Sequence, residues 1–224
     1  MDAVIKVGGS LAEDPKWLRA LCHKLSELAK KYAIIVVPGG GKFADAVREY
    51  DRRFALSSDV SHRMAILGMD QFGLLLSQIM PNSRVFRQLE NAKELAEAKA
   101  VPIFLPSHWM FQEDPLENSW DVTSDSIAAY VASRVNAEKV VLATDVDGIF
   151  TCDPKTYADA KLIERLSAKK LATLNRRTSV DRYLLKLILK SQIDCYVVNG
   201  AYPDRVEAVL AGNQATCTFV SART

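Results

Sequence analysis

The sequence has few cysteines and histidines, and it contains no long hydrophobic run. Its 4 Cys and 3 His residues include no C-x-x-C pair, so a zinc site is not expected. Sparse use of cysteine also fits a reducing cytoplasm. No stretch reaches the ~18 apolar residues of a membrane span, and Lys6 interrupts the early apolar run that a signal peptide would need. We therefore expect a cytoplasmic protein that has no membrane partner.

An excess of positive or negative charge is also absent. The 29 Lys and Arg residues nearly balance the 27 Asp and Glu residues, which leaves a net charge of +2 and no polybasic run. This balance predicts no nucleic-acid partner. The 224 residues contain no repeat or flexible linker and suffice for one large α/β domain. We expect residues 1–224 to form a single domain whose two lobes, about 1–121 and about 122–224, carry different functions.

Two glycine-rich turns, each at the end of a short apolar run, are the most informative segments that are present. They lie in residues 4–10 (V-I-K-V-G-G-S) and residues 34–42 (I-I-V-V-P-G-G-G-K). A β-branched run before consecutive glycines is typical of a buried parallel strand that leads into a helix. Such turns present backbone N–H groups to an anion, most often phosphate. Two turns, with Lys6 in one and Lys42 after the other, predict two phosphates brought together.

Strand and helix patterns alternate along the chain. Strands are predicted at residues 4–7, 34–37, 84–86, 101–106, 140–143, 196–198 and 216–220, the last at a sheet edge. Helices are predicted at residues 15–31, 42–54, 59–79, 88–99, 124–135, 167–174, 179–191 and 203–211. Residues 107–121 contain aromatic and acidic residues without clear periodicity, which predicts a loop or hairpin. The alternation predicts an α/β fold in which helices cover both faces of an open, mostly parallel sheet, a three-layer αβα arrangement.

Carboxylates stand at the ends of two further elements. Asp145 and Asp147 follow the buried strand at 140–143 in the segment T-D-V-D-G, and open α/β sheets bind ligands at such carboxyl ends. Asp125 begins the helix at 124–135, where it serves either as a helix cap or as a site residue.

Six segments occur in the order found in one kinase family. They are K-V-G-G-S (6–10), P-G-G-G-K (38–42), T-S-D-S-I-A-A (123–129), T-D-V-D-G-I (144–149), D-P-K (153–155) and V-N-G (198–200). With these segments the chain resembles the amino acid kinase superfamily, which includes acetylglutamate, aspartate, carbamate, uridylate and isopentenyl phosphate kinases. The resemblance implies an open parallel sheet between helices, phosphoryl transfer from ATP with Mg²⁺, a small-molecule phosphate acceptor and a homo-oligomer. It names no metal ligand. The lobe at about 1–121 would bind the acceptor and the lobe at about 122–224 the nucleotide.

The resemblance also implies roles for individual residues. Catalytic roles fall on Lys6, Asp125 and Lys186. ATP contacts fall on Lys6, Gly8, Gly9, Ser10, Thr144, Asp145, Asp147, Gly148, Asp153 and Lys155. Acceptor contacts fall on Gly39, Gly40, Gly41, His62, Arg63, Asp70, Thr123 and Ser124. The segment around Lys186, T-S-V-D-R-Y-L-L-K (178–186), departs from the T-G-G-M-x-x-K element of many relatives, and an ordinary amphipathic helix explains it as well.

Two longer runs indicate the acceptor. The runs S-H-R-M-A-I-L-x-M-D-Q (61–71) and W-D-V-T-S-D-S-I-A-A (120–129) resemble small archaeal-type kinases of methanofuran biosynthesis. These enzymes phosphorylate [5-(aminomethyl)furan-3-yl]methyl phosphate to its diphosphate. His62 and Arg63 would then bind an anion, and Asp70, or else Asp59, would bind an ammonium; the alternative is that all are surface charges of a helix. Uridylate kinase, isopentenyl phosphate kinase and a non-catalytic nucleotide-binding storage or regulatory protein are the other candidate functions.

Overall fold

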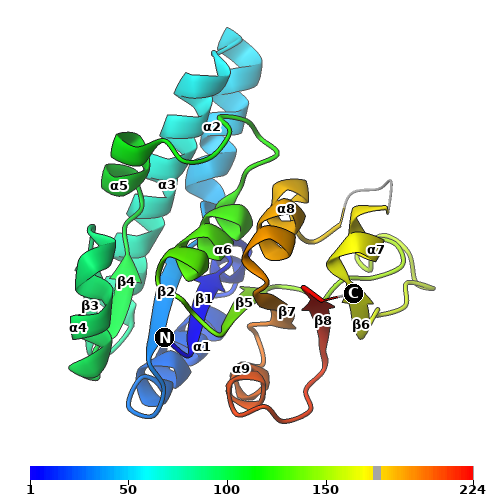
Figure 1. Ribbon diagram of the computed structural model, residues 1–224. Coiled ribbons are helices and arrows are strands. Elements are labelled where there is room, and N and C mark those ends of the chain that lie inside the picture. Colours follow the sequence, from blue (N-terminus) through cyan, green and yellow to red (C-terminus); the bar gives the residue numbers. More distant parts are fainter. Residues whose placement is uncertain (174–177, 224) are drawn as a thin grey trace.

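An eight-stranded sheet with helices packed on both faces forms the centre of the molecule (Figure 1). The structure is a computed structural model, and it describes residues 1–173 and 178–223. The strands are β1 (Ala3–Val7), β2 (Ile34–Pro38), β3 (Ser83–Phe86), β4 (Val101–Phe104), β5 (Lys139–Thr144), β6 (Arg165–Ser167), β7 (Asp194–Asn199) and β8 (Cys217–Ser221). Their order across the sheet is β3-β4-β2-β1-β5-β7-β8-β6. Only the β7–β8 pair is antiparallel among the described strands, which confirms the predicted open, mostly parallel sheet.

The helices connect most consecutive strands and cover the sheet. They are α1 (Pro15–Leu28), α2 (Gly41–Phe54), α3 (Ser58–Ile79), α4 (Ala92–Glu97), α5 (Ser107–Glu113), α6 (Ser124–Arg134), α7 (Ala168–Ala172), α8 (Arg182–Ser191) and α9 (Pro203–Leu210), with short 3₁₀ helices η1 (Gly9–Glu13) and η2 (Leu89–Asn91). In the described part of the chain, none of these helices is both long and apolar enough to cross a membrane.

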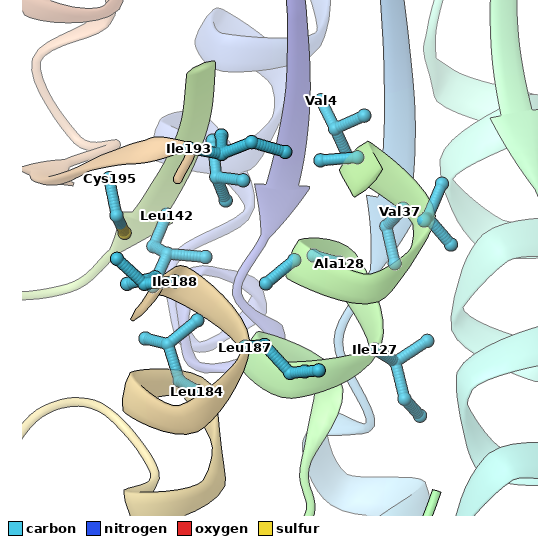
Figure 2. Close-up of a cluster of buried hydrophobic side chains, with 14 of the residues drawn as sticks. Val4, Val37, Ile127, Ala128, Leu142, Leu184, Leu187, Ile188, Ile193 and Cys195 are labelled. Carbon is cyan, nitrogen blue, oxygen red and sulfur yellow. The ribbon is translucent and has the colours of Figure 1, made fainter. Parts of the chain in front are cut away.

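The alternation of side chains along β1 shows why both faces of the sheet are covered. Val4 belongs to a hydrophobic cluster with residues of α6 and α8, whereas Ile5 and Val7 belong to a second cluster with residues of α1 and α9. Successive side chains of a strand point to opposite faces, so a strand of small apolar residues packs into two layers at once. Figure 2 shows the first cluster, in which α6 and α8 lie together over the sheet. The three-layer αβα fold is thereby confirmed.

The segment 107–121 was predicted to be a loop or hairpin, and this prediction is wrong for its first half. Residues 107–113 form α5, which buries Trp109 and Met110. The carboxylate of Asp70, on α3, accepts hydrogen bonds from the backbone N–H and hydroxyl of Ser107 at the start of α5. The helix is thus stabilised from a distant element, and the local pattern carries no sign of that contact.

The prediction of an edge strand at 216–220 is also wrong, because β8 lies between β7 and β6. The edge is formed by β6, a strand of 3 residues that the sequence pattern did not predict. Several predicted helices also differ from the observed bounds. Residues 88–99 divide into η2 and α4, and α8 begins at Arg182 because the Asp181 side chain caps it. The helix predicted at 167–174 is observed as α7, which ends at Ala172. Residue 174 of the predicted range lies outside the described residues.

Candidate active site

The site lies where the middle strands of the sheet end. β1 pairs with β2 on one side and with β5 on the other, and Val7 lies in register with both Pro38 and Ala143. The segments that follow these three strands therefore emerge side by side. The chain moves from β1 to β2 on one side of β1 and later returns to β5 on the other, and ligands bind at such a change of direction in open α/β sheets.

The two glycine-rich turns touch each other through their backbones. A Cβ atom on Gly9 would lie 2.2 Å from Cα of Gly41, and one on Gly39 would lie 2.7 Å from the backbone nitrogen of Gly9. The N–H of Gly39 donates to the carbonyl of Val7 at 2.8 Å, which holds the second turn against the end of β1. Glycine is thus required for contact between the turns, in addition to the expected approach of a ligand.

Lys6 and Asp125 form an ion pair near the end of β1. Lys6 shares the face of β1 with Val4, which α6 covers, so its side chain points toward the first turn of α6. Its Nζ lies 2.8 Å from Oδ1 of Asp125, and the two side chains are 12% and 8% exposed. The helix cap is Thr123, whose hydroxyl accepts a hydrogen bond from the N–H of Asp125. The carboxylate of Asp125 is therefore free to orient the lysine.

A cavity of about 290 Å³ lies beside this ion pair. It is bounded by the two glycine turns, the start of α6, one face each of α2 and α3, and Trp120. Among the predicted site residues it is lined by Lys6, Gly8, Gly9, Ser10, Gly40, Gly41, His62, Thr123 and Ser124. We call it the acceptor cavity after the predicted acceptor contacts that line it, which are Gly40, Gly41, His62, Thr123 and Ser124. Gly39, Arg63 and Asp70 do not line it.

The geometry of α3 explains which of its polar residues reach the acceptor cavity. His62, Ala65, Ile66 and Met69 repeat at intervals of three and four and share one face of the helix. Arg63 instead pairs with Asp59 at 2.8 Å, and Asp70 is used at the start of α5, as described above. Neither predicted ammonium ligand, Asp70 or Asp59, lines the cavity. Burial raises the pKa of Asp70, while hydrogen bonds from Ser107 partly oppose this.

His62 is buried in the wall of the acceptor cavity. Burial lowers the pKa of this imidazole, and a hydrogen bond with the backbone of Ser119 opposes the shift only in part. The neutral form is therefore favoured at neutral pH. His62 offers the cavity a hydrogen-bonding ring rather than a fixed positive charge.

The fixed charges of the acceptor cavity come largely from residues that sequence reasoning missed. Arg48 pairs with Asp45 at 2.8 Å, and Lys42, the lysine already noted after the second glycine turn, pairs with Glu13 at 2.8 Å. All four line the cavity. In each pair the two opposite charges bind each other, and the lining of the cavity therefore carries charged groups of both signs.

Trp120 was not predicted as a site residue either. Its indole N–H donates to Asp51 at 2.7 Å, and the guanidinium of Arg48 lies 4.7 Å from the ring centroid. These contacts fix the segment before α6 against α2. The aromatic residue in W-D-V-T-S-D was visible in the sequence, but its contacts with α2 were not.

A second cavity, of about 430 Å³, lies beyond the end of β5. Of the predicted ATP residues, Thr144, Asp145, Gly148, Asp153 and Lys155 line it, and we call it the nucleotide cavity. Asp147 does not line it, since its carboxylate binds Arg205 at 2.6 Å and Asn199 at 2.9 Å.

Asp145 connects the nucleotide cavity with the first glycine turn. Its carboxylate accepts a hydrogen bond from the Ser10 hydroxyl at 2.9 Å and another from the ammonium of Lys155. Burial alone would raise the pKa of Asp145, but the hydrogen bonds from Lys155 and Ser10 outweigh burial and lower it. Asp145 is therefore held as a carboxylate between two predicted ATP contacts.

A third cavity, also of about 430 Å³, lies between the other two, and we call it the central cavity. It shares Arg48, Trp120 and Thr123 with the acceptor cavity and Thr178 and Ser179 with the nucleotide cavity. Asp125 lines it. The three cavities thus adjoin one another through shared lining residues, and the Lys6–Asp125 pair joins the acceptor cavity, which Lys6 lines, to the central cavity.

Lys186 lies apart from these three cavities. Its Nζ is 3.5 Å from Oε1 of Glu117, and its side chain is 68% exposed. It also lies 4.8 Å from the centroid of the Tyr183 ring. These contacts are those of a surface residue on α8, and its catalytic role stays a prediction.

Comparison with known proteins identifies the family of the chain. The amino acid kinase family model matches residues 1–199. The chain is 36% identical over 218 residues to [5-(aminomethyl)furan-3-yl]methyl phosphate kinase of Methanocaldococcus jannaschii, covering 97% of this chain and 96% of that one. It is 27% identical over 238 residues to uridylate kinase of Methanococcus vannielii, covering 96% and 98%.

Solved structures show the same fold. Uridylate kinase from Archaeoglobus fulgidus matches with a TM-score of 0.77 at 24% identity, covering 99% of this chain and 100% of that one. UMP kinase from Ureaplasma parvum matches with a TM-score of 0.79 at 22% identity, covering 99% and 98%. The chain belongs to the amino acid kinase family, whose members are ATP-dependent kinases.

Proposed function

We propose that the chain transfers the terminal phosphoryl group of ATP to the phosphate of [5-(aminomethyl)furan-3-yl]methyl phosphate, which forms the diphosphate. The observation that carries this proposal is the Lys6–Asp125 ion pair at the junction of the acceptor and central cavities. The named relative with 36% identity supports the choice of acceptor. The half of the chain up to about residue 121 would bind mainly the acceptor, and the other half mainly the nucleotide.

The size and charge of the acceptor cavity fit such a substrate. A volume of about 290 Å³ suits a small molecule and stands at the low end of the range for ligand sites. The acceptor phosphate would be bound by Lys42, Arg48 and the backbone of the glycine turns. Its ammonium would be bound by Glu13 or Asp45, which replace Asp70 and Asp59 as our candidates because they line the cavity. The face of Trp120 would pack against the furan ring.

The proposed reaction needs positioning and positive charge more than it needs a base. A phosphate acceptor is already ionised near neutral pH, so no hydroxyl proton has to be removed. Lys6 would stabilise the negative charge that spreads over the transferring phosphoryl group, and Asp125 would keep the ammonium of Lys6 in place. N–H groups of the two touching glycine turns would hold the donor and acceptor phosphates close together.

Mg²⁺ bound with ATP would neutralise part of the phosphate charge in this reaction. Within residues 1–173 and 178–223, no group of three or more His, Cys, Asp or Glu side chains is arranged to hold a metal ion. The residues present therefore fit an ion that is coordinated mainly by phosphate oxygens and water, as Mg²⁺ often is. ATP itself would contact the predicted residues that line the nucleotide cavity.

Turnover with a panel of acceptors tests the proposal. The panel contains the aminomethylfuran phosphate, its hydroxymethyl analogue, UMP and isopentenyl phosphate, with ADP and diphosphate products measured. We expect the aminomethylfuran phosphate to have the highest kcat/KM. Rapid use of UMP with no use of the furan phosphate would overturn the acceptor assignment and make this chain a uridylate kinase. ATP binding without turnover of any acceptor would support the non-catalytic alternative.

The ammonium contact is tested by Asp45→Asn and Glu13→Gln. Loss of the correct carboxylate should lower kcat/KM for the amine. The corresponding loss of transition-state stabilisation should be about 1.5–3 kcal/mol, which is the range for a hydrogen bond to a charged group. The hydroxymethyl analogue is the matched control, and its kcat/KM should change much less. Equal losses for both acceptors would contradict ammonium recognition at that residue.

We also propose a homo-oligomer in which α3 forms part of the interface. Leu67, Leu74 and Leu75 of this helix are exposed in the single chain. Large apolar residues gathered on one helix are typical of an interface. Sedimentation equilibrium of the wild type and of Leu74→Glu tests this proposal. A monomeric wild type would contradict it.

A further inference from the structure

Asp181 accepts hydrogen bonds from the starts of two different helices. It precedes α8 and accepts the backbone N–H of Leu184 at 2.7 Å, as an ordinary helix cap does. Its other four hydrogen bonds all come from the start of α6. They are donated by the N–H of Thr123 at 2.9 Å, the hydroxyl of Thr123 at 2.7 Å, the N–H of Ser126 at 3.0 Å and the hydroxyl of Ser126.

The start of α6 is the part of the helix that forms the site. Asp125 lies between the two residues that Asp181 holds, and it pairs with Lys6 at 2.8 Å. Thr123 and Ser124 line the acceptor cavity. The geometry points to Asp181 as a positioning residue for phosphoryl transfer, whose single carboxylate keeps the first turn of α6 in the orientation that pairs Asp125 with Lys6.

The number of donors argues for positioning rather than direct chemistry. A carboxylate offers about four lone-pair sites, and five described donors already bind this one. Asp181 lines the central cavity but has little capacity left for a substrate or a metal ion. Its role in the reaction would therefore be exerted through α6.

The same contacts explain why the group is a carboxylate. Two helix N-termini and five donors compensate its negative charge, so the carboxylate can lie in the wall of the central cavity without an uncompensated charge. Burial and the neighbouring Asp125 raise the pKa of Asp181, and the hydrogen bonds from Ser126 and Thr123 work in the opposite direction. An asparagine has one acceptor oxygen instead of two, and its NH₂ group would face N–H and O–H donors.

Steady-state kinetics of Asp181→Asn and Ser126→Ala test the inference, with the acceptor that the wild type uses best. Ser126 is fully buried, and its hydroxyl donates to Asp181. Ser126→Ala therefore removes one donor to Asp181 and leaves the cap of α8 by Asp181 intact. A displaced catalytic group costs on the order of 10²-fold in rate, and we expect kcat of Asp181→Asn to fall by about this factor. Ser126→Ala should lower kcat several-fold. KM for ATP should change little in both variants.

The double variant and a distant cap complete the design. If both changes act through the same contact, the double variant should be no slower than Asp181→Asn alone. Asp14→Asn is the matched control, because Asp14 caps α1 with one hydrogen bond to the N–H of Lys16 and lines none of the cavities described above. Its kcat should equal that of the wild type.

A lower Tm with unchanged kcat in Asp181→Asn would overturn the inference and leave Asp181 as a structural cap. If that variant does not fold, Ser126→Ala decides by the same criterion. The inference rests on phosphoryl transfer at the proposed site but not on the identity of the acceptor. If UMP replaces the furan phosphate as substrate, the acceptor assignment fails, and the Asp181 test proceeds with UMP.

Discussion

Gly9→Ala should damage both catalysis and stability, because Gly9 is the point at which the two glycine turns meet. The new Cβ atom would lie 2.2 Å from Cα and 2.3 Å from the nitrogen of Gly41. Both are backbone atoms, so no side-chain rotation relieves the contact. Ordinary van der Waals contact begins near 3.4 Å, and the turns must therefore separate by about 1.2 Å.

The size of this displacement sets the expected effects. An error of about 1 Å in a reacting geometry costs on the order of 10²-fold in rate, and we expect kcat to fall by about that factor. Overpacking of this kind costs about 1–3 kcal/mol of folding free energy. For a chain of 224 residues, each kcal/mol corresponds to about 2–4 °C in Tm, so Tm should fall by about 2–12 °C.

The assay is acceptor phosphorylation measured well below Tm, together with thermal unfolding followed by circular dichroism. Gly212→Ala is the matched control, because Gly212 has a φ of +73° but nothing within 4 Å of an added Cβ. It should lower Tm by strain of about 1–2 kcal/mol and leave kcat unchanged. A Gly9→Ala enzyme with wild-type kcat and Tm would refute the argument that backbone contact fixes the two turns.

Three further predictions concern single polar side chains. Asp125→Asn keeps the shape of the side chain and leaves the Thr123 cap in place, so kcat should fall by orders of magnitude with little change in Tm; an active variant would remove Asp125 from the mechanism. Because burial lowers the pKa of His62, the unfolded chain binds more protons than the folded chain between the folded pKa and 6.5. The free energy of unfolding should therefore rise with pH through that window, relative to His62→Gln. Urea unfolding from about pH 5 to about pH 8 measures this difference, and a free energy that falls with pH would contradict it. Asp70→Asn weakens the hydrogen bonds at the start of α5 and should lower the free energy of unfolding by about 1 kcal/mol. It should change kcat/KM equally for the amine and hydroxymethyl acceptors. A loss confined to the amine would instead assign ammonium recognition to Asp70.

The parts of the fold that the sequence predicts are those encoded by local patterns. β1, β2 and β5 are short apolar runs, and the glycines after β1 and β2 mark where each strand ends. α5 was missed because its stability depends on Asp70, 37 residues earlier in the chain. β8 was misplaced because β6, which covers its outer side, has only 3 residues and too little pattern to be recognised.

The site divides in the same way. Lys6 and Asp125 were found because each lies in a segment with a recognisable neighbourhood, and the structure brings them to 2.8 Å. Arg48 and Trp120 were missed because their significance comes from a contact between residues 72 positions apart. The structure places Asp70 against Ser107 and outside the lining of the acceptor cavity, because a sequence match identifies a residue but not the face of the helix on which it lies.

The backbone contact between the glycine turns separates two tasks that many enzymes combine in the same side chains. The spacing between the donor and acceptor phosphates would follow from the register of β1 and β2, which pairs Val7 with Pro38. Substitutions on the cavity faces of α2 and α3 can then change the shape of the acceptor cavity without altering that spacing. One fold could then bind new acceptors through substitutions on α2 and α3 alone. Redesign of this enzyme for another phosphorylated acceptor should accordingly begin at α2 and α3 and keep both turns as they are.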